Sequence, residues 1–77
     1  MKLDIISPEK TVYKGEAEFI ALPGVQGAFT ILERHAPIIS ALSKGNVVYR
    51  QGEKEVSLVI DSGFVEAKNN IVTVCIE

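Results

Sequence analysis

The chain has very few of the residues that build covalent staples or metal centres. Among its 77 residues there is one cysteine, Cys75, one histidine, His35, and no tryptophan. A single cysteine cannot close a disulfide within the chain, and these two residues fall short of a structural zinc site. The unpaired thiol fits a reducing compartment, so we expect a cytosolic location. A domain this small without a disulfide or a metal site must pack efficiently or be stabilised by a partner.

Clusters of one charge and long apolar runs are also missing. The formal net charge is −2, and 8 basic and 10 acidic residues are scattered along the chain. Nucleic-acid surfaces and electrostatic membrane anchors both need clustered basic residues, so we expect neither. No apolar run approaches the roughly 20 residues that span a bilayer. Strand-like sequence follows Met1 directly, so we expect no signal peptide.

Strand-forming residues are what the chain has in quantity. Val, Ile, Thr, Phe and Tyr make up about a third of it, and these types favour strands. Apolar residues alternate with period two at the start of the chain and within 55–60 and 71–76, and no window has a helical stripe. Short strands between turn signals predict one all-β domain, a two-sheet antiparallel β-sandwich of about eight to ten strands. The turns are predicted at 7–9, 14–15, 23–24, 43–46, 51–53, 61–63 and 68–70.

Pro23-Gly24 predicts a type II turn, because proline fixes the first corner and glycine accepts the positive φ of the second. Gly27 offers another flexible backbone position three residues later. This segment is either a plain hairpin connection or a contact loop. A phosphate cradle is disfavoured, because no helix follows these glycines.

His35 is the natural candidate for catalysis, yet the sequence fixes no partner for it. A nucleophile would have to be Ser40 or Cys75, and no acid is placed to orient the imidazole. We therefore expect a structural histidine that donates to a loop carbonyl. The carboxylates of Glu53, Glu55 and Asp61 form no site and are expected to face water.

The segment 36–42 is too apolar for a strand that exposes one face to solvent. Alternation turns outward either Ile38, Ser40 and Leu42 or Ile39 and Ala41. The strand is either buried on both faces or presents an apolar strip that marks a protein interface.

Taken in order, these motifs resemble the amino-terminal domain of the epsilon subunit of F-type ATP synthase, over the whole chain. The matching residues are Leu22-Pro23-Gly24, Gly27, Ile31-Leu32, His35-Ala36-Pro37-Ile38-Ile39, Leu42 and Gly45. Flanking matches are Asp4-Ile5-Ile6-Ser7-Pro8, Gly15, Gly63-Phe64-Val65-Glu66 and Asn70-Ile71-Val72-Thr73-Val74.

The resemblance implies a non-catalytic subunit of the rotating central stalk, which links gamma to the c-ring and supports coupling of proton translocation to ATP synthesis. The implied c-ring contact consists of Gly24, Val25, Gln26, Gly27, Ala28 and Phe29. The implied gamma contact consists of His35, Ala36, Pro37, Ile38, Ile39, Ser40 and Leu42. No cofactor, metal or small-molecule ligand is expected. The implied location is peripheral, at the cytoplasmic face of the bacterial inner membrane within the F1 sector, touching the membrane only through the complex.

The chain departs from the family pattern in three places. Ala28 stands where members often carry an acidic residue, and Glu33-Arg34 replaces a Pro-Gly pair before His35. The family usually continues into a carboxy-terminal helical hairpin, whereas this sequence stops at Glu77. We therefore expect a single domain over 1–77 without the hairpin, and neither its inhibition of hydrolysis nor its nucleotide binding.

Two other functions compete with this interpretation. Lipoyl- and biotinyl-type carrier domains are also small and all-β, and they present a modifiable lysine on a hairpin, here Lys54, although the flanking residues differ from their motifs. A small oligosaccharide- or oligonucleotide-binding barrel is disfavoured, because the five aromatics and balanced charge offer little stacking platform.

Overall fold

The computed structural model describes all 77 residues and consists of nine strands without a helix, which confirms the all-β prediction. No helix is therefore available to cross a membrane. The strands are β1 (Lys2–Ile6), β2 (Thr11–Glu16), β3 (Phe19–Gly24), β4 (Gly27–Leu32), β5 (Ile38–Leu42), β6 (Gly45–Gln51), β7 (Lys54–Ile60), β8 (Gly63–Lys68) and β9 (Ile71–Ile76).

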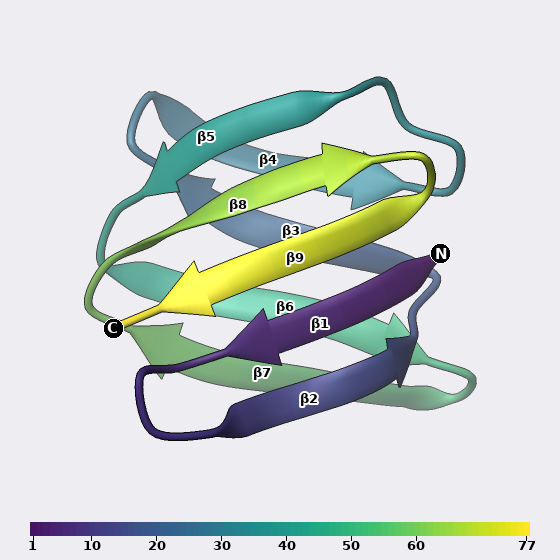
Figure 1. The fold of residues 1–77 in the computed structure, drawn as a ribbon, viewed down its shortest axis with the longest axis horizontal. Coiled ribbons are helices and arrows are strands. Elements are labelled where there is room, and N and C mark those ends of the chain that lie inside the picture. Colours follow the sequence, from purple (N-terminus) through teal and green to yellow (C-terminus); the bar gives the residue numbers. More distant parts are fainter.

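The strands form two layers that face each other across one core (Figure 1). The front layer runs β2-β1-β9-β8-β5, and the back layer runs β4-β3-β6-β7. Every pairing is antiparallel except that of β1 with β9. The layers are joined along one border, where Gly24 of β3 pairs with Leu42 of β5. The result is a sandwich with one closed corner.

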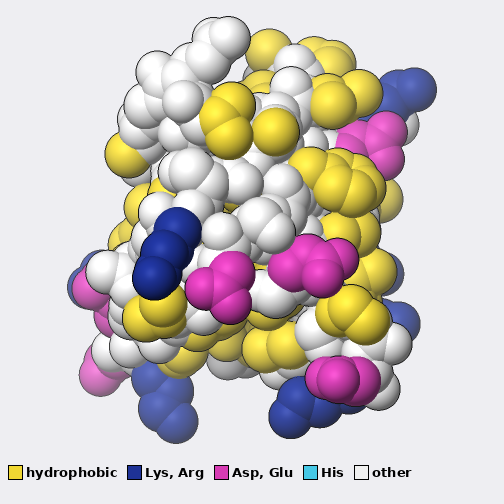
Figure 2. All heavy atoms as spheres, turned by 90° about the vertical axis from the view of Figure 1, so that its left-hand side faces the viewer, with side chains coloured by type: hydrophobic (Ala, Val, Ile, Leu, Met, Phe, Trp, Pro, Cys, Tyr) yellow, Lys and Arg dark blue, Asp and Glu magenta, His cyan; other side chains and the backbone are white.

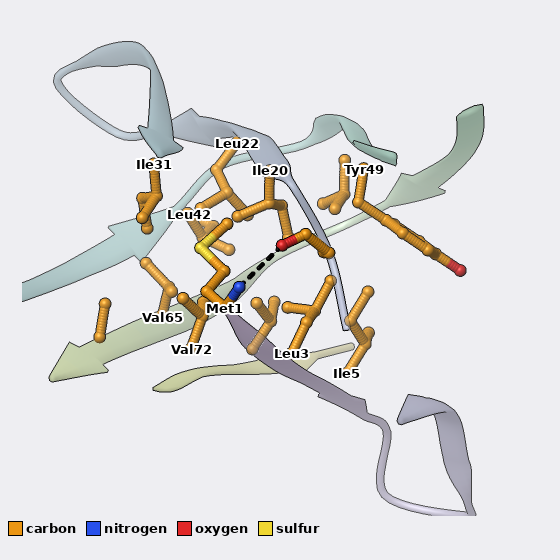
Figure 3. Packing of buried hydrophobic residues seen from close by; sticks show 14 of the residues in the cluster. Met1, Leu3, Ile5, Ile20, Leu22, Ile31, Leu42, Tyr49, Val65 and Val72 are labelled. Atoms are coloured by element: carbon orange, nitrogen blue, oxygen red, sulfur yellow. Dashed lines mark hydrogen bonds between the residues drawn. The ribbon is translucent and has the colours of Figure 1, made fainter. Parts of the chain in front are cut away.

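Alternation along each strand fills the space between the layers. Leu3 and Ile5 point inward from β1, and Val72 and Val74 point inward from β9, all fully buried. Figure 3 shows Leu3, Ile5 and Val72 facing side chains of the back layer such as Ile20 and Leu22. The alternation predicted within 55–60 and 71–76 is confirmed, because Ile60, Val72 and Val74 lie in the core and Val56, Leu58 and Ile76 pack against it. The buried set comprises Met1, Leu3, Ile5, Ala17, Ile20, Leu22, Ile31, Leu42, Val47, Tyr49, Ile60, Val65, Ala67, Val72 and Val74.

Most of the predicted turns are present, and two are not. Asn69 and Asn70 both take positive φ between β8 and β9, as a tight hairpin requires. The turn predicted at 14–15 is wrong, because those residues lie inside β2. The turn predicted at Pro23-Gly24 is also wrong, because β3 continues through Gly24. The chain instead reverses at 25–26, and Gly27 follows with a φ of 130°.

Pro23 can lie inside strand β3 because its missing N–H would point away from β4, toward the connection between β5 and β6. The N–H and C=O of one strand residue point to the same edge. The Pro23 carbonyl accepts from the Ser43 N–H at 2.7 Å, so its ring faces the connection between β5 and β6 and leaves the β4 ladder intact. A side chain at Gly45 would come within 2.8 Å of Pro23 Cβ. Glycine at 45 is therefore what lets the proline fit.

The amino group of Met1 lies inside the molecule, in contact with several acceptors. It donates to the Ala17 carbonyl oxygen at 3.0 Å, the bond drawn as a dashed line in Figure 3. It also pairs with the Glu33 carboxylate and, at 3.6 Å, with that of Glu16. Glu33 in turn accepts from the Asn70 side-chain amide at 3.4 Å. These contacts connect the start of β1, the segment after β4 and the turn before β9.

Candidate interaction surfaces

The hairpin of β3 and β4 projects at one end of the sandwich, on the left of Figure 1. Val25, Gln26, Gly27 and Ala28 are all exposed at its tip. Figure 2 looks onto this end, and its upper left part, over the hairpin, carries no charged side chain. The six predicted ring-contact residues therefore lie together, with an apolar and amide surface in place of an acidic one.

Two of these six residues lie underneath the tip. Gly24 is buried, and a Cβ there would come within 2.8 Å of the Phe29 ring and 2.6 Å of the Gly27 carbonyl oxygen. The Phe29 side chain thus packs directly across the Gly24 backbone and is itself half-buried. This close contact braces the hairpin from the core side.

His35 lies at the opposite end of β4, in the segment that leads to β5. Its Nδ1 is 3.0 Å from the Ala36 carbonyl oxygen, and since a carbonyl only accepts, Nδ1 carries the hydrogen. Its Nε2 is buried without a partner. The loop is held in part by Arg34, which takes a φ of 59° and donates its N–H to Asn70 Oδ1 at 2.8 Å. The histidine therefore has the structural contact that the sequence predicts.

Strand β5 turns one isoleucine outward and the other inward. Ile39 is 79% exposed, while Ile38 packs against the core. Of the two alternation patterns left open by the sequence, the structure has Ile39 and Ala41 outward. Leu42 is only 3% exposed, so it supports the predicted gamma surface from within and cannot contact a partner directly.

A groove brings the hairpin tip and β5 together. It is lined by residues of both predicted contact surfaces: Val25, Gln26, Gly27, Phe29, Ile38, Ile39, Ser40 and Ala41. The Val25 N–H donates to the Ala41 carbonyl oxygen at 3.1 Å, which fixes the tip against the end of β5. The two surfaces, separate in the sequence, are therefore neighbours at this corner, whereas His35 lies at the far end.

An apolar row on the outer face of the front layer escaped the sequence analysis. Ala41 pairs with Phe64, Phe64 with Cys75, and Cys75 with Ile6, so these side chains form a line across β5, β8, β9 and β1. Phe64 and Ile6 are both exposed. Alternation in β8 could have revealed the row, because inward Val65 and Ala67 leave Phe64 outward.

The polar side chains near these surfaces are engaged in local contacts. Ser40 Oγ donates to the Ala41 carbonyl oxygen at 3.0 Å, and no hydrogen bond joins it or Cys75 to His35. No group of three or more His, Cys, Asp or Glu side chains is placed to hold a metal ion.

Two tyrosines that lie away from these surfaces have shifted pKa values. The rings of Tyr13 and Tyr49 pack against each other with centroids 4.6 Å apart and planes tilted by 39°. Burial raises the pKa of both phenols above the ordinary value. The Glu16 carboxylate adds to the effect at Tyr13, and Tyr13 adds to it at Tyr49. Tyr13 also donates its hydroxyl hydrogen to the Glu16 carbonyl oxygen at 2.7 Å.

Comparison with known proteins bears on this geometry. The family model described as ATP synthase, Delta/Epsilon chain, beta-sandwich domain matches residues 1–77. The chain belongs to this family. The match confirms the resemblance seen in the motifs, and the two-layer strand arrangement agrees with a β-sandwich of the epsilon type.

Curated epsilon chains resemble the protein along nearly its whole length. The ATP synthase epsilon chain of Leptospira interrogans is 43% identical over 74 residues, which is 96% of this chain and 58% of the relative. That of Desulforamulus reducens is 40% identical over 73 residues, 95% of this chain and 55% of the relative. The chain thus spans a little over half the length of these curated relatives.

A solved structure of an ATP synthase shows the same fold. A chain in the Euglena gracilis mitochondrial ATP synthase, determined with OSCP, F1 and c-ring, superposes with a TM-score of 0.89 at 21% identity, covering 96% of this chain and 48% of the other. At this identity the likeness concerns the fold alone.

The carrier-domain alternative is not supported. The family match assigns all 77 residues to the epsilon-type sandwich. Lys54 lies at the first position of β7 and pairs across the ladder with Gln51. It is an exposed residue of an ordinary hairpin between β6 and β7.

Proposed function

We propose that this epsilon-type domain acts over residues 1–77 as a non-catalytic part of the ATP synthase central stalk, joining gamma to the c-ring. The hairpin tip, residues 24–29, contacts the ring, and the surface from His35 to Ala41 contacts gamma. Rotation of the ring then reaches gamma through the sandwich. In a bacterium the domain would lie at the cytoplasmic face of the inner membrane and reach the membrane only through the complex.

The observation that carries this proposal is the outward direction of Ile39. This side chain is 79% exposed on a strand whose other large apolar residues point inward. It lies beside the uncharged groove and in the same layer as exposed Phe64. Although Glu66 is its cross-strand neighbour, a large exposed apolar side chain at the border of an uncharged groove is a feature of protein interfaces.

Stiffness between the two contact surfaces supports a mechanical role. The tip is tied to β5 by the bond from Val25 to Ala41, and Phe29 is packed on Gly24. Close-packed interiors deform little under load. A partner that moves the tip therefore also moves β5, which is what the transfer of rotation requires.

Binding to gamma tests the proposal with a matched pair of variants. Ile39→Glu puts a charge at the border of the groove, and Val59→Glu puts one at a similarly exposed position, 72% exposed, on β7 at the opposite border of the molecule. We expect Ile39→Glu to weaken gamma binding at least tenfold and Val59→Glu to leave it within about twofold. Equal affinities of the two folded variants would contradict the proposed gamma surface.

A further inference from the structure

Strand β4 has one edge that no other strand covers. It pairs with β3 along its whole length and with nothing else. The Pro23 carbonyl and the Val25 N–H face β5, so by alternation Leu22 and Gly24 face β4. Their partners Phe29 and Gly27 therefore face β3.

The remaining residues of β4 direct their backbone groups to the open side. Alternation leaves the N–H and C=O of Ala28, Thr30 and Leu32 at the free edge. None of the additional backbone or side-chain hydrogen bonds engages them. Three donors and three acceptors are thus available in register.

This edge is unlike the other borders of the sandwich. Proteins usually blunt free edges with charge, proline or a bulge. Strand β2 carries Lys14 and Glu16, and its register with β1 is interrupted at Val12; β7 begins with Lys54 and Glu55. Pro37 precedes β5, whose end is already bonded to Val25.

Strand β4, with the sequence GAFTIL, has none of these devices. Its outward side chains are uncharged, and Leu32 is 60% exposed. The edge is therefore open, uncharged and unprotected over its full length.

We propose that an extended, uncharged segment of gamma adds to β4 as a further strand. Pairing by backbone hydrogen bonds requires an extended peptide, and the uncharged side chains of Ala28, Thr30 and Leu32 favour uncharged residues facing them. The added gamma segment ends opposite the region of Glu33, because the Glu33 carboxylate is already engaged by the Met1 amino group and the Asn70 amide. The assignment to gamma rests on the function proposed above.

Size argues against a second copy of this chain as the occupant. A stable interface buries roughly 1,000 Å² or more, and one strand of six residues added at an edge falls short of that. The segment must therefore belong to a protein that is held at another surface as well. Gamma, docked on β5, meets this condition.

Amide hydrogen exchange of the complete chain, free and bound to gamma, tests the pairing residue by residue. In the free chain we expect the N–H groups of Ala28, Thr30 and Leu32 to exchange rapidly and those of Phe29 and Ile31 to be protected by their pairing with β3. On binding we expect at least tenfold protection at the three open amides. A complex that forms without this protection would overturn the added strand and leave the proposed function standing, whereas absence of a complex would overturn both.

A pair of variants at Thr30 distinguishes the contribution of the backbone N–H to gamma binding from that of the side chain. Thr30→Pro removes one open N–H at an edge position where proline is tolerated, and Thr30→Ala keeps it. We expect Thr30→Pro to weaken gamma binding about fivefold or more and Thr30→Ala to stay within about twofold. Equal binding by the two folded variants, or protection of the same amides in a dimer of the chain alone, would overturn the proposal.

Discussion

Replacing Glu33 by glutamine perturbs the contact between the Met1 amino group and the loop after β4. The amino terminus is fully shielded from solvent, while the Glu33 side chain is 50% exposed. Glu33→Gln keeps the shape and removes the charge. The ammonium then retains the Ala17 carbonyl at 3.0 Å and the Glu16 carboxylate at 3.6 Å. One strong partner of a buried charge is lost.

The expected cost follows from the exposure of the two partners. Breaking a fully buried ion pair costs about 3–5 kcal/mol, and a hydrogen bond to a charged group contributes about 1.5–3 kcal/mol. Because Glu33 is half in water, screening places the loss near the lower value, about 1.5 kcal/mol. For a domain of this size that lowers Tm by at least about 6 °C.

Glu16→Gln is the matched control, because its carboxylate is farther away and 78% exposed. We expect it to cost about 0.5 kcal/mol or less. Urea unfolding at pH 7 followed by circular dichroism measures both free energies. The amide of Arg34 should exchange faster in Glu33→Gln, because its acceptor Asn70 loses a charged partner. Equal stabilities of the two variants would refute the reasoning.

Three other changes have defined outcomes. Gly63→Ala should lower the free energy of unfolding by about 1–3 kcal/mol, because its Cβ would come within 2.3 Å of the Cys75 carbonyl oxygen. Gly27→Ala should cost about 1–2 kcal/mol through its φ of 130° alone, since no atom lies within 4 Å; urea unfolding checks both, and an unchanged stability would contradict either estimate. The raised pKa values of Tyr13 and Tyr49 mean that the folded state favours the neutral phenols. Stability should therefore hold below about pH 10 and fall as the pH rises through the raised values; denaturant midpoints between pH 8 and 11 measure this, and a flat profile would contradict it.

Strand number and core alternation could be predicted because each depends on local pattern. The alternation in 71–76 puts Val72 and Val74 on the same face, and they are buried in the core, whichever strand pairs with this segment. The position of the first hairpin could not be predicted in the same way. Pro23-Gly24 has the composition of a turn, yet tertiary pairing keeps both in β3, because Ser43 and Gly45 accommodate the proline from another part of the chain.

The candidate surfaces were harder to predict, because they depend on strand pairings between segments far apart in the sequence. The sequence left open which isoleucine faces outward, and the pairing of β5 with β8 and Gly24 decides for Ile39. The row from Ala41 to Ile6 exists only because β9 pairs in parallel with β1. The free edge of β4 likewise follows from the sheet order, which no local window contains.

Site-specific photo-crosslinking in the assembled synthase tests the central claim most directly, with one probe at Gln26 on the hairpin tip and one at Ile39 on β5. Both positions are exposed in the structure and belong to different predicted contacts. The account predicts that the Gln26 probe captures the c-ring subunit and the Ile39 probe captures gamma. Capture of gamma by neither probe, or of the ring by the Ile39 probe alone, would contradict it.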